Sequence, residues 1–276
     1  NGMRLYPGAE RFLRASRLKG ANHYLYTHRD SAALNALKRD GLKAYTAFFR
    51  GFGRVLKEGL HFDHENGDKL KELLLFASDR TADDGLVSLR QYRDAMPAAQ
   101  KEIYYLTAES LANARRNPHL EAFRKRQIDV LFFADPIDEW ILEALEEYDG
   151  CKLRAVDRGE IGLGSDEEQA QAKQKLQEDD KQFRPLLDFI RATLSADVKE
   201  VRLSSRLTDS ACCLVADEAA MNPGMRRMMQ VMGQEVPKSQ RVLEVNPAHP
   251  LLKRLLERLG TERESPAFAA QAGLLF

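Results

Sequence analysis

Five of the chain's seven methionines fall within twelve residues, at Met221, Met225, Met228, Met229 and Met232. Four of them follow the spacing i, i+4, i+7, i+11, which predicts one face of an α-helix. The methionine side chain is unbranched and polarizable, so such a face can contact partners of many shapes. The alternative is that the stripe packs into the protein's own core, which is the usual fate of an apolar helical stripe.

The single tryptophan, Trp140, lies in the segment 136–148, which the sequence predicts to be a helix opened by Pro136. Ile137, Ile141 and Leu145 form the apolar stripe that should face a sheet, and Trp140 flanks that stripe. We therefore expect Trp140 to be either a core residue or a partly exposed apolar anchor. Aromatic anchors contribute much of the binding energy of an interface when they are desolvated.

Residues that could bind a metal or a phosphate are sparse. His61 and His64 could be a ligand pair, but Asn66-Gly67 predicts a turn and no third ligand is suggested. The glycines Gly51 and Gly53 lie inside a helical pattern, whereas a phosphate loop follows a strand. We predict no metal site and no cofactor-binding residue in this chain.

Three acidic residues, Asp135, Asp138 and Glu139, follow a predicted strand, where α/β proteins often place active sites. Acids at this position also complement a helix dipole and accept hydrogen bonds from the free N–H groups of the first turn. We favour the structural interpretation and predict no catalytic residue.

The composition excludes several classes of protein. Lys+Arg and Asp+Glu both number 42, so the basic excess of a nucleic-acid-binding protein is missing. No apolar stretch approaches the roughly 18 residues of a transmembrane helix, and the N-terminal residues lack the apolar core of a signal peptide. The three cysteines form no CxxC pair, which favours reduced thiols in a cytoplasmic protein.

Strands and helices alternate through the middle of the chain. We expect helices at 42–60, 68–76, 110–116, 118–126 and 136–148, and strands at 102–107, 128–133 and 152–156. Repeated units of this length imply a parallel sheet with right-handed crossovers. Residues 157–181 are polar and predict a linker that runs into a helix ending near 194. Beyond it we expect strands at 198–203, 211–215 and 240–245, and helices at 249–259 and 266–276, an α+β pattern.

Several segments together resemble one family. QKEIYYLTAES (100–110) and NPHLEAFRKRQIDVLFFADPIDEWILEALEEYDGCKLRAV (117–156) are similar to the middle domain of the ninety-kilodalton heat-shock chaperones, as are FGRVLKEGL (52–60), KLKELLLFAS (69–78) and DGLVSLRQYRDAM (84–96). VKEVRLSSRLTDSACCLV (198–215) and LEVNPAHPLLKRL (243–255) resemble the family's C-terminal domain. The resemblance covers about residues 41–276 in the right order, and the nearest type is the bacterial form, high-temperature protein G.

The resemblance implies a fold of α/β and α+β parts. A three-layer βαβαβ part of the middle domain would be followed by a smaller α+β C-terminal domain with a truncated pair of dimerisation helices. The implied divisions are an unassigned segment 1–40, the C-terminal part of the middle domain at 41–157, a linker at 158–181, and the truncated C-terminal domain at 182–276.

The family binds unfolded or partly folded client proteins and forms homodimers, so the resemblance implies both partners here. It favours client contact for Trp140, Met221, Met225, Met228 and Met229. It also implies a dimerisation seam of apolar residues near the end of the chain, namely Leu251, Leu252, Leu255, Leu256, Leu259, Phe268, Leu274 and Leu275. We expect no nucleic-acid or membrane partner.

ATP and magnesium are implied for the full-length family, whose ATP-binding domain precedes the region that this chain resembles. The family's nucleotide-contacting arginine lies in a Ser-Arg-Glu motif, and the chain contains no such motif. We therefore expect the ATPase domain to be absent and the chain to be no enzyme. Two other classes stay open: a phosphate- or nucleotide-using α/β enzyme, and a scaffold or co-chaperone built from chaperone domains.

Overall fold

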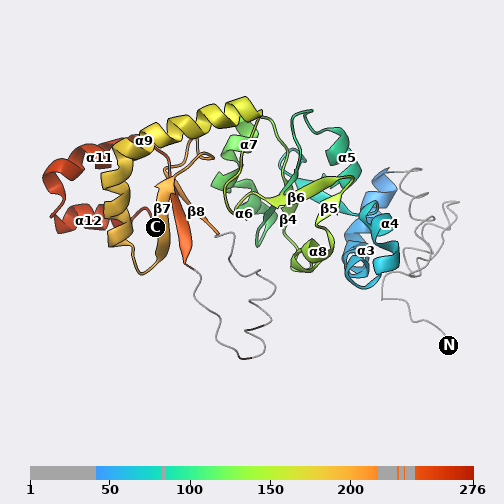
Figure 1. Cartoon of the computed structure of the whole chain (residues 1–276). Helices are drawn as coiled ribbons and strands as arrows, with labels where there is room; N and C mark the ends of the chain where they lie inside the picture. The colour runs from blue at the N-terminus through green and yellow to red at the C-terminus, as the bar shows by residue number, and fades with distance from the viewer. Residues whose placement is uncertain (1–41, 83–84, 217–228, 230–232, 234–239) are drawn as a thin grey trace, which may run out of the picture. The chain divides into compact units, whose positions relative to one another are not determined.

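The computed structural model describes residues 42–82, 85–216, 229, 233 and 240–276 (Figure 1). The chain divides into two compact units, Asn1–Leu75 and Phe76–Phe276. This division differs from the predicted boundaries at 157 and 181, and those boundaries stay predictions.

The described part of the first unit is built on the helix α3 (Leu42–Phe62). The helix runs through Gly51 and Gly53 without a break. At Gly53 an added Cβ would lie 2.7 Å from the Phe49 ring, so the close approach of that ring explains the glycine. The Tyr45 hydroxyl donates to the Leu73 carbonyl at 2.5 Å, and Leu56, Leu60 and Leu70 are buried.

The predicted helix at 68–76 is only partly correct. A one-turn 3-10 helix (His64–Asn66) leads into α4, which covers Gly67–Lys71, and Leu75–Ser78 form the strand β1 with all four residues buried. The run LLLF is apolar at every position, so it fits a fully buried strand as well as a buried helix.

The second unit contains a mixed sheet in the order β2-β1-β4-β3-β6-β5. Strands β3 (Ile103–Thr107), β4 (Leu131–Phe133) and β6 (Cys151–Ala155) confirm the three predicted strands, and β3 pairs in parallel with both of the others. The sheet is not purely parallel, because β1 pairs antiparallel with β4 and β5 antiparallel with β6. Strand β2 (Val87–Ser88) completes it.

Short helices follow strands β2 and β3, and two of them, α6 (Leu111–Arg115) and α7 (Glu121–Lys125), pack on one face of this sheet. Ser88 and Gln91 form a capping box at α5 (Leu89–Asp94), and Ser110 caps α6. Pro118 opens a 3-10 turn (Pro118–Leu120) that leads into α7, close to the predicted start. Ala114 of α6 and Phe123 of α7 pack in one buried cluster with strand residues that include Leu106 and Phe132.

The helix predicted at 136–148 is shorter in the structure. Helix α8 covers Asp138–Ala144, and Glu147–Tyr148 form the strand β5. Asp149 and Gly150 have φ values of 48° and 73°, and they join β5 to β6 as a two-residue hairpin. Asp-Gly with two positive φ angles favours a tight hairpin turn.

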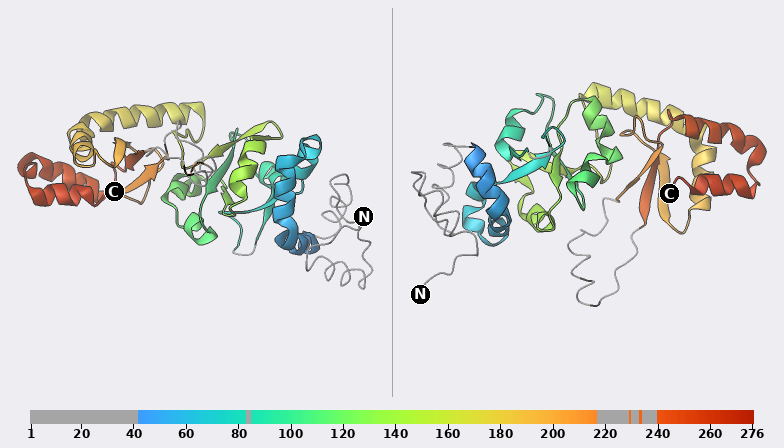
Figure 2. Two further views of the ribbon diagram at one scale, coloured as in Figure 1. Left: turned by 90° about the horizontal axis from the view of Figure 1, so that it is seen from below. Right: turned by 180° about the vertical axis from the view of Figure 1, so that it is seen from behind.

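The rest of the second unit is organised around α9 (Asp166–Thr193) and a three-stranded sheet (Figures 1 and 2). Strand β9 (Arg241–Val245) lies between β7 (Val198–Leu203), which is parallel to it, and β8 (Cys212–Val215), which is antiparallel. Helices α11 (Pro250–Glu262) and α12 (Pro266–Gly273) pack against α9 and close the core.

The mixed α/β class is therefore confirmed, and every strand predicted from the sequence is present. The complete three-layer organisation and the pairing of the last helices for dimerisation stay predictions. Among the residues that the structure describes, no helix is both long and apolar enough to cross a membrane.

Candidate functional site

Trp140 lies on the surface of α8, with 54% of its area exposed. Ile141 and Leu145, the next members of the predicted stripe, are fully buried and fix the helix against the sheet. Trp140 is therefore not a core residue, and its role as an anchor for a partner stays a prediction. An aromatic side chain held on a fixed helix can bury a large apolar area with little loss of conformational freedom.

The acidic residues before Trp140 have a structural role. Asp138 accepts a hydrogen bond from the Asp135 backbone N–H at 3.0 Å, and Asp135 accepts one from the Ile137 N–H at 3.2 Å. Asp138 and Glu139 are both buried in the first turn of α8. These contacts fix the turn from which Trp140 projects. They differ from the predicted capping of the first helical N–H groups, because the N-cap residue Ile137 makes no side-chain cap hydrogen bond and the carboxylates bind N–H groups before the helix.

Most of the methionine stripe lies outside the described residues. Met221, Met225, Met228 and Met232 are not among them, whereas Met229 is helical and half-buried. The stripe follows β8 and precedes β9 in the chain, so its two ends belong to the second unit. Client contact by these methionines stays a prediction.

The predicted dimerisation residues divide into two sets. Leu255, Leu259, Phe268 and Leu275 are buried in the core that α9, α11 and α12 share, together with Leu252. Leu251 and Leu274 are 43% and 86% exposed. Leu256 is half-buried. Leu251 and Leu274 are thus the members most accessible to a partner, and the dimerisation seam stays a prediction.

A buried cluster of charges joins the two sheets of the second unit. Arg206, which is 3% exposed, donates to Glu244 of β9 at 2.9 Å through Nε and to the Val156 carbonyl at 2.5 Å through Nη1. Its Nη2 also donates to the Gly159 carbonyl. The second oxygen of Glu244 accepts from Arg202 at 2.9 Å. One guanidinium therefore binds the small sheet to the chain that leaves β6.

A second charged side chain, Glu121 at the start of α7, also links the two parts of this unit. Its carboxylate accepts hydrogen bonds from the backbone N–H groups of Thr208, Asp209 and Ser210 at 2.7 to 3.0 Å, and from the Ser210 hydroxyl. Partial burial alone would raise the pKa of Glu121, but these hydrogen bonds outweigh it and hold the pKa below its usual value. The loop between β7 and β8 is thus attached to the larger sheet.

His119 is buried in the same region. Its Nε2 lies 3.2 Å from the Leu214 carbonyl of β8, and its Nδ1 lies 3.9 Å from the Cys213 Sγ. Burial, and then the charge of Arg206, lower the pKa of His119, so the neutral ring is favoured. Burial also raises the pKa of Cys213 to about 12, which keeps this thiol protonated, as the sequence interpretation of structural thiols expects.

Sequence reasoning missed this cluster. Arg206, Glu244 and Glu121 are separated by tens of residues, and no local pattern distinguishes them from the chain's other charged residues. The one available signal was Glu244 itself, a charged residue between Leu243 and Val245 in a predicted strand, since such a residue is seldom buried without a partner.

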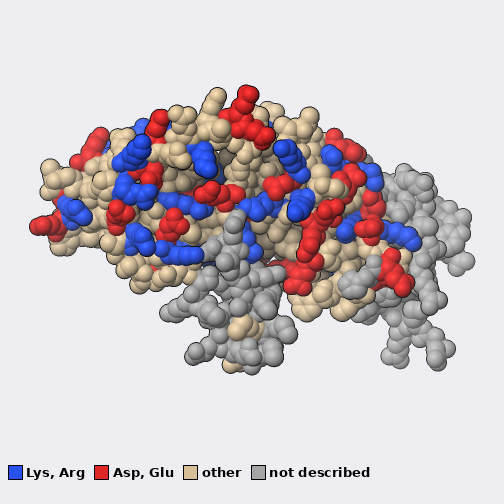
Figure 3. All heavy atoms as spheres, viewed as in Figure 1, with Lys and Arg blue, Asp and Glu red and all other residues tan. Residues whose placement is uncertain are grey.

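Charges of both signs are interspersed over the described part of the face shown in Figure 3. This distribution agrees with the equal numbers of acidic and basic residues. Asp63, in the segment that carries His61 and His64, accepts hydrogen bonds from Asn66 and so forms the expected turn. Within 42–82, 85–216 and 240–276, no group of three His, Cys, Asp or Glu residues is placed to hold a metal ion.

Comparison with known proteins gives one consistent result. The model of the Hsp90 protein family matches residues 26–276, which extends the family match into the segment that the sequence interpretation had left unassigned. The chaperone protein HtpG of Geobacter metallireducens is 46% identical over 245 residues, covering 89% of this chain and 38% of that protein. The HtpG protein of Rhodococcus jostii is 38% identical over 267 residues, covering 97% and 40%.

The chain thus spans about two fifths of the length of the curated relatives that it matches. The family model covers nearly all of it, and the relatives agree over most of the same residues. On this basis the chain belongs to the Hsp90 family of chaperones and is of the bacterial HtpG type.

Proposed function

We propose that this chain holds unfolded or partly folded client proteins as part of an Hsp90-type chaperone. The observation that carries the proposal is Trp140, a large aromatic residue that is half-exposed on a helix held in place by the fully buried Ile141. In a chaperone, such a residue can bind exposed apolar segments of many clients, because it buries area without requiring one partner shape. The methionine stripe at 221–232 would add a second, adaptable contact.

Trp140 provides its own test, because it is the only tryptophan of the chain. Its fluorescence should shift to shorter wavelength when an unfolded client that lacks tryptophan binds over it. Trp140→Ala should weaken the binding of that client by about tenfold, as expected for an aromatic interface residue. Phe62→Ala, which removes another exposed aromatic side chain, serves as the control. Unchanged fluorescence and unchanged affinity would contradict the proposal.

The methionine stripe has a separate test. The double variant Met228→Glu, Met229→Glu should weaken client binding while the circular dichroism spectrum stays the same, if the stripe is exposed. A double variant that binds clients normally would assign the stripe to the core.

We propose further that the chain itself hydrolyses no ATP, and that ATP and magnesium act elsewhere in the full-length protein. The chain contains no Ser-Arg-Glu motif, and the turns that follow β3 and β4 contain no glycine, which supports this proposal. A purified sample with robust ATPase activity would refute it. The homodimer, the cytoplasmic location, and the lack of nucleic-acid and membrane partners are part of the same proposal, and they rest on the family and on the even charge balance.

A further inference from the structure

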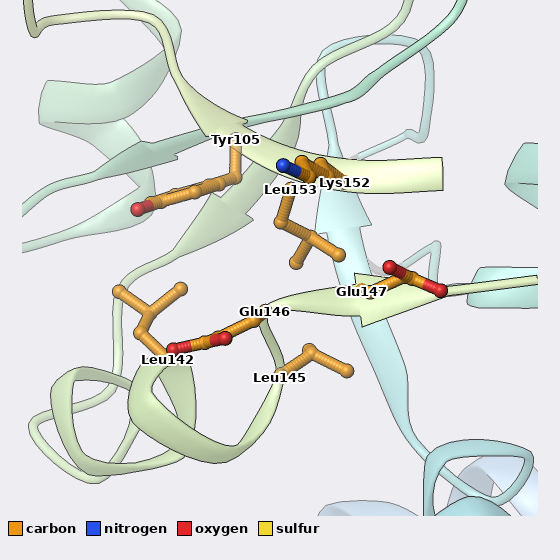
Figure 4. Close-up of a pocket in the computed structure, with 7 residues that line it drawn as sticks. All are labelled: Tyr105, Leu142, Leu145, Glu146, Glu147, Lys152 and Leu153. Atoms are coloured by element: carbon orange, nitrogen blue, oxygen red, sulfur yellow. The ribbon is translucent and has the colours of Figure 1, made fainter. Parts of the chain in front are cut away.

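A hollow of about 350 Å³ lies between the end of α8, the hairpin β5–β6 and strand β3 (Figure 4). It is lined by Tyr105, Leu142, Leu145, Glu146, Glu147, Lys152 and Leu153. This volume is at the lower end of the range for ligand sites and can accept one or two bulky side chains. Residues 140 and 142 point to different sides of α8, so the hollow is separate from the Trp140 surface.

The walls of the hollow combine an apolar part, made by the three leucines and the Tyr105 ring, with the charged residues Glu146, Glu147 and Lys152. Leu145 is fully buried at its base, while Tyr105, Leu142 and Leu153 are only half-buried. Figure 4 shows Leu153 of β6 pointing towards the α8 leucines, with the Tyr105 ring beside them. The Tyr105 ring is supported by Phe133 of the neighbouring strand, with 5.0 Å between the ring centroids. A bulky apolar side chain placed here would be surrounded by carbon on several sides.

The rim of the hollow carries an unbalanced negative charge. Lys152 is opposite Glu147 in the β5–β6 register, so these two charges offset each other. Glu146 is exposed, and within the described part of the chain it has no ion-pair partner within 4.0 Å. The segment 136–151 contains six acidic residues and no lysine or arginine. Tyr105, by contrast, has Arg154 and Arg158 among its charged neighbours, so the excess negative charge is confined to the α8–β5 side of the hollow.

We infer that this hollow is a second client subsite, selective for extended segments in which a bulky apolar residue is next to a lysine or an arginine. The apolar side chain would enter between Leu142 and Leu153, and the neighbouring cation would contact the Glu146 carboxylate. Charge complementarity favours this occupant over an acidic or neutral segment of equal apolarity. The inference rests on the proposed client-holding function and gives it a sequence preference.

The experiment uses the whole chain and two labelled peptides that share a central leucine or phenylalanine, flanked by lysines in one and by glutamates in the other. Fluorescence anisotropy should show tighter binding of the lysine peptide. Glu146→Lys should weaken the lysine peptide by about fivefold and strengthen the glutamate peptide, because the local charge changes sign. Leu142→Gln should weaken both peptides.

Glu178→Lys is the matched control, since it makes the same charge change at an exposed position of α9 that does not line the hollow. It should leave the peptide preference unchanged. Equal binding of the two peptides by the unaltered chain, or equal effects of the two charge reversals, would overturn the subsite. If the chain still prevents aggregation of an unfolded client while binding neither peptide, the subsite fails and the proposed function stands. If it captures no unfolded protein at all, the proposed function itself fails.

Discussion

At the scale of single residues, the buried charges around Glu244 are the most demanding feature of the molecule. Glu244 and Arg206 are both almost completely buried, and each depends on the other for compensation. Burying two charges costs a large desolvation free energy, which their attraction and hydrogen bonds only offset. We therefore interpret the pair as fixing the geometry of the contact between the small sheet and the chain after β6, and not as a source of extra stability.

Arg206→Gln should lower the free energy of unfolding by about 3–5 kcal/mol, because it leaves Glu244 charged and incompletely compensated. Urea denaturation measures the change. Arg184→Gln is the control, since it breaks an exposed ion pair with Asp180 on α9 and should cost less than about 1 kcal/mol. Equal losses in the two variants would show that the buried pair has no special role.

His119 should make stability depend on pH. Its pKa in the folded protein lies below the value of about 6.5 that the unfolded chain has, so the unfolded chain binds the proton more readily. The contribution of His119 to stability is complete above pH 6.5, and it is lost as the pH falls from there towards the folded-state pKa. The free energy of unfolding should therefore be lower at pH 5.5 than at pH 7.5.

His119→Gln should remove this part of the pH dependence, as measured by urea unfolding at pH 7.5 and 5.5. The charged groups that face His119 include Arg206, Asp157 and Glu244. The pKa of Glu121 is also lowered, but its titration changes stability only below about pH 4.5. Its effect is therefore separate from that of His119. A variant with the same pH dependence as the unaltered chain would exclude His119 as the source.

At the scale of elements, the long periodic segments were predictable and the short ones were not. Helices α3 and α11 and strand β7 follow clear apolar spacing, so the sequence locates them to within a few residues. Strand β1 was mistaken for helix because an entirely apolar run carries no period. Strand β5 has two residues, and only the turn chemistry of Asp149-Gly150 could have revealed it.

The candidate site likewise has features that the sequence predicts and features that it does not. The spacing of residues around 140 indicated a helix stripe, but it could not decide whether Trp140 was inside or outside, because a flanking position is compatible with both. The hollow beside Tyr105 joins residues from three segments, so it follows from sheet order and not from any local pattern.

The stability of the N-terminal end of helix α9 depends on hydrogen bonds made by its first residues. Ser165 accepts from the Glu168 N–H, the Glu168 carboxylate accepts from the Ser165 N–H, and Glu168 also pairs with Arg126 at 2.9 Å. The helix residues 166–175 are mostly exposed, so little packing supports this end. Ser165→Ala should therefore cost about 1 kcal/mol locally.

Amide hydrogen exchange of residues 167–175 measures this loss, because fraying of an exposed helix end need not change global unfolding. Ser195→Ala, just beyond the other end of α9, should leave that exchange unchanged. Similar protection in both variants would show that the capping box does not limit the opening of the helix.

At the scale of the whole molecule, the second unit combines a rigid core with separate exposed apolar positions. Its two sheets are joined through Arg206, Glu121 and His119, so the hairpin, α8 and the small sheet belong to one connected body. Trp140, Leu251 and Leu274 project from that body. Exposed apolar residues on a rigid scaffold can bind a partner without first refolding, which suits both client capture and self-association.

Self-association should depend on Leu251 and Leu274 and not on the buried members of the predicted seam. The double variant Leu251→Ser, Leu274→Ser should keep the unfolding free energy within about 1 kcal/mol, because both side chains are exposed. Leu255→Ser should lower it by about 3 kcal/mol or more, since Leu255 is buried in the core. Sedimentation velocity over a concentration series should then show less self-association for the double variant than for the unaltered chain. If the double variant associates as strongly as the unaltered chain, the partner-facing surface does not include the exposed ends of α11 and α12.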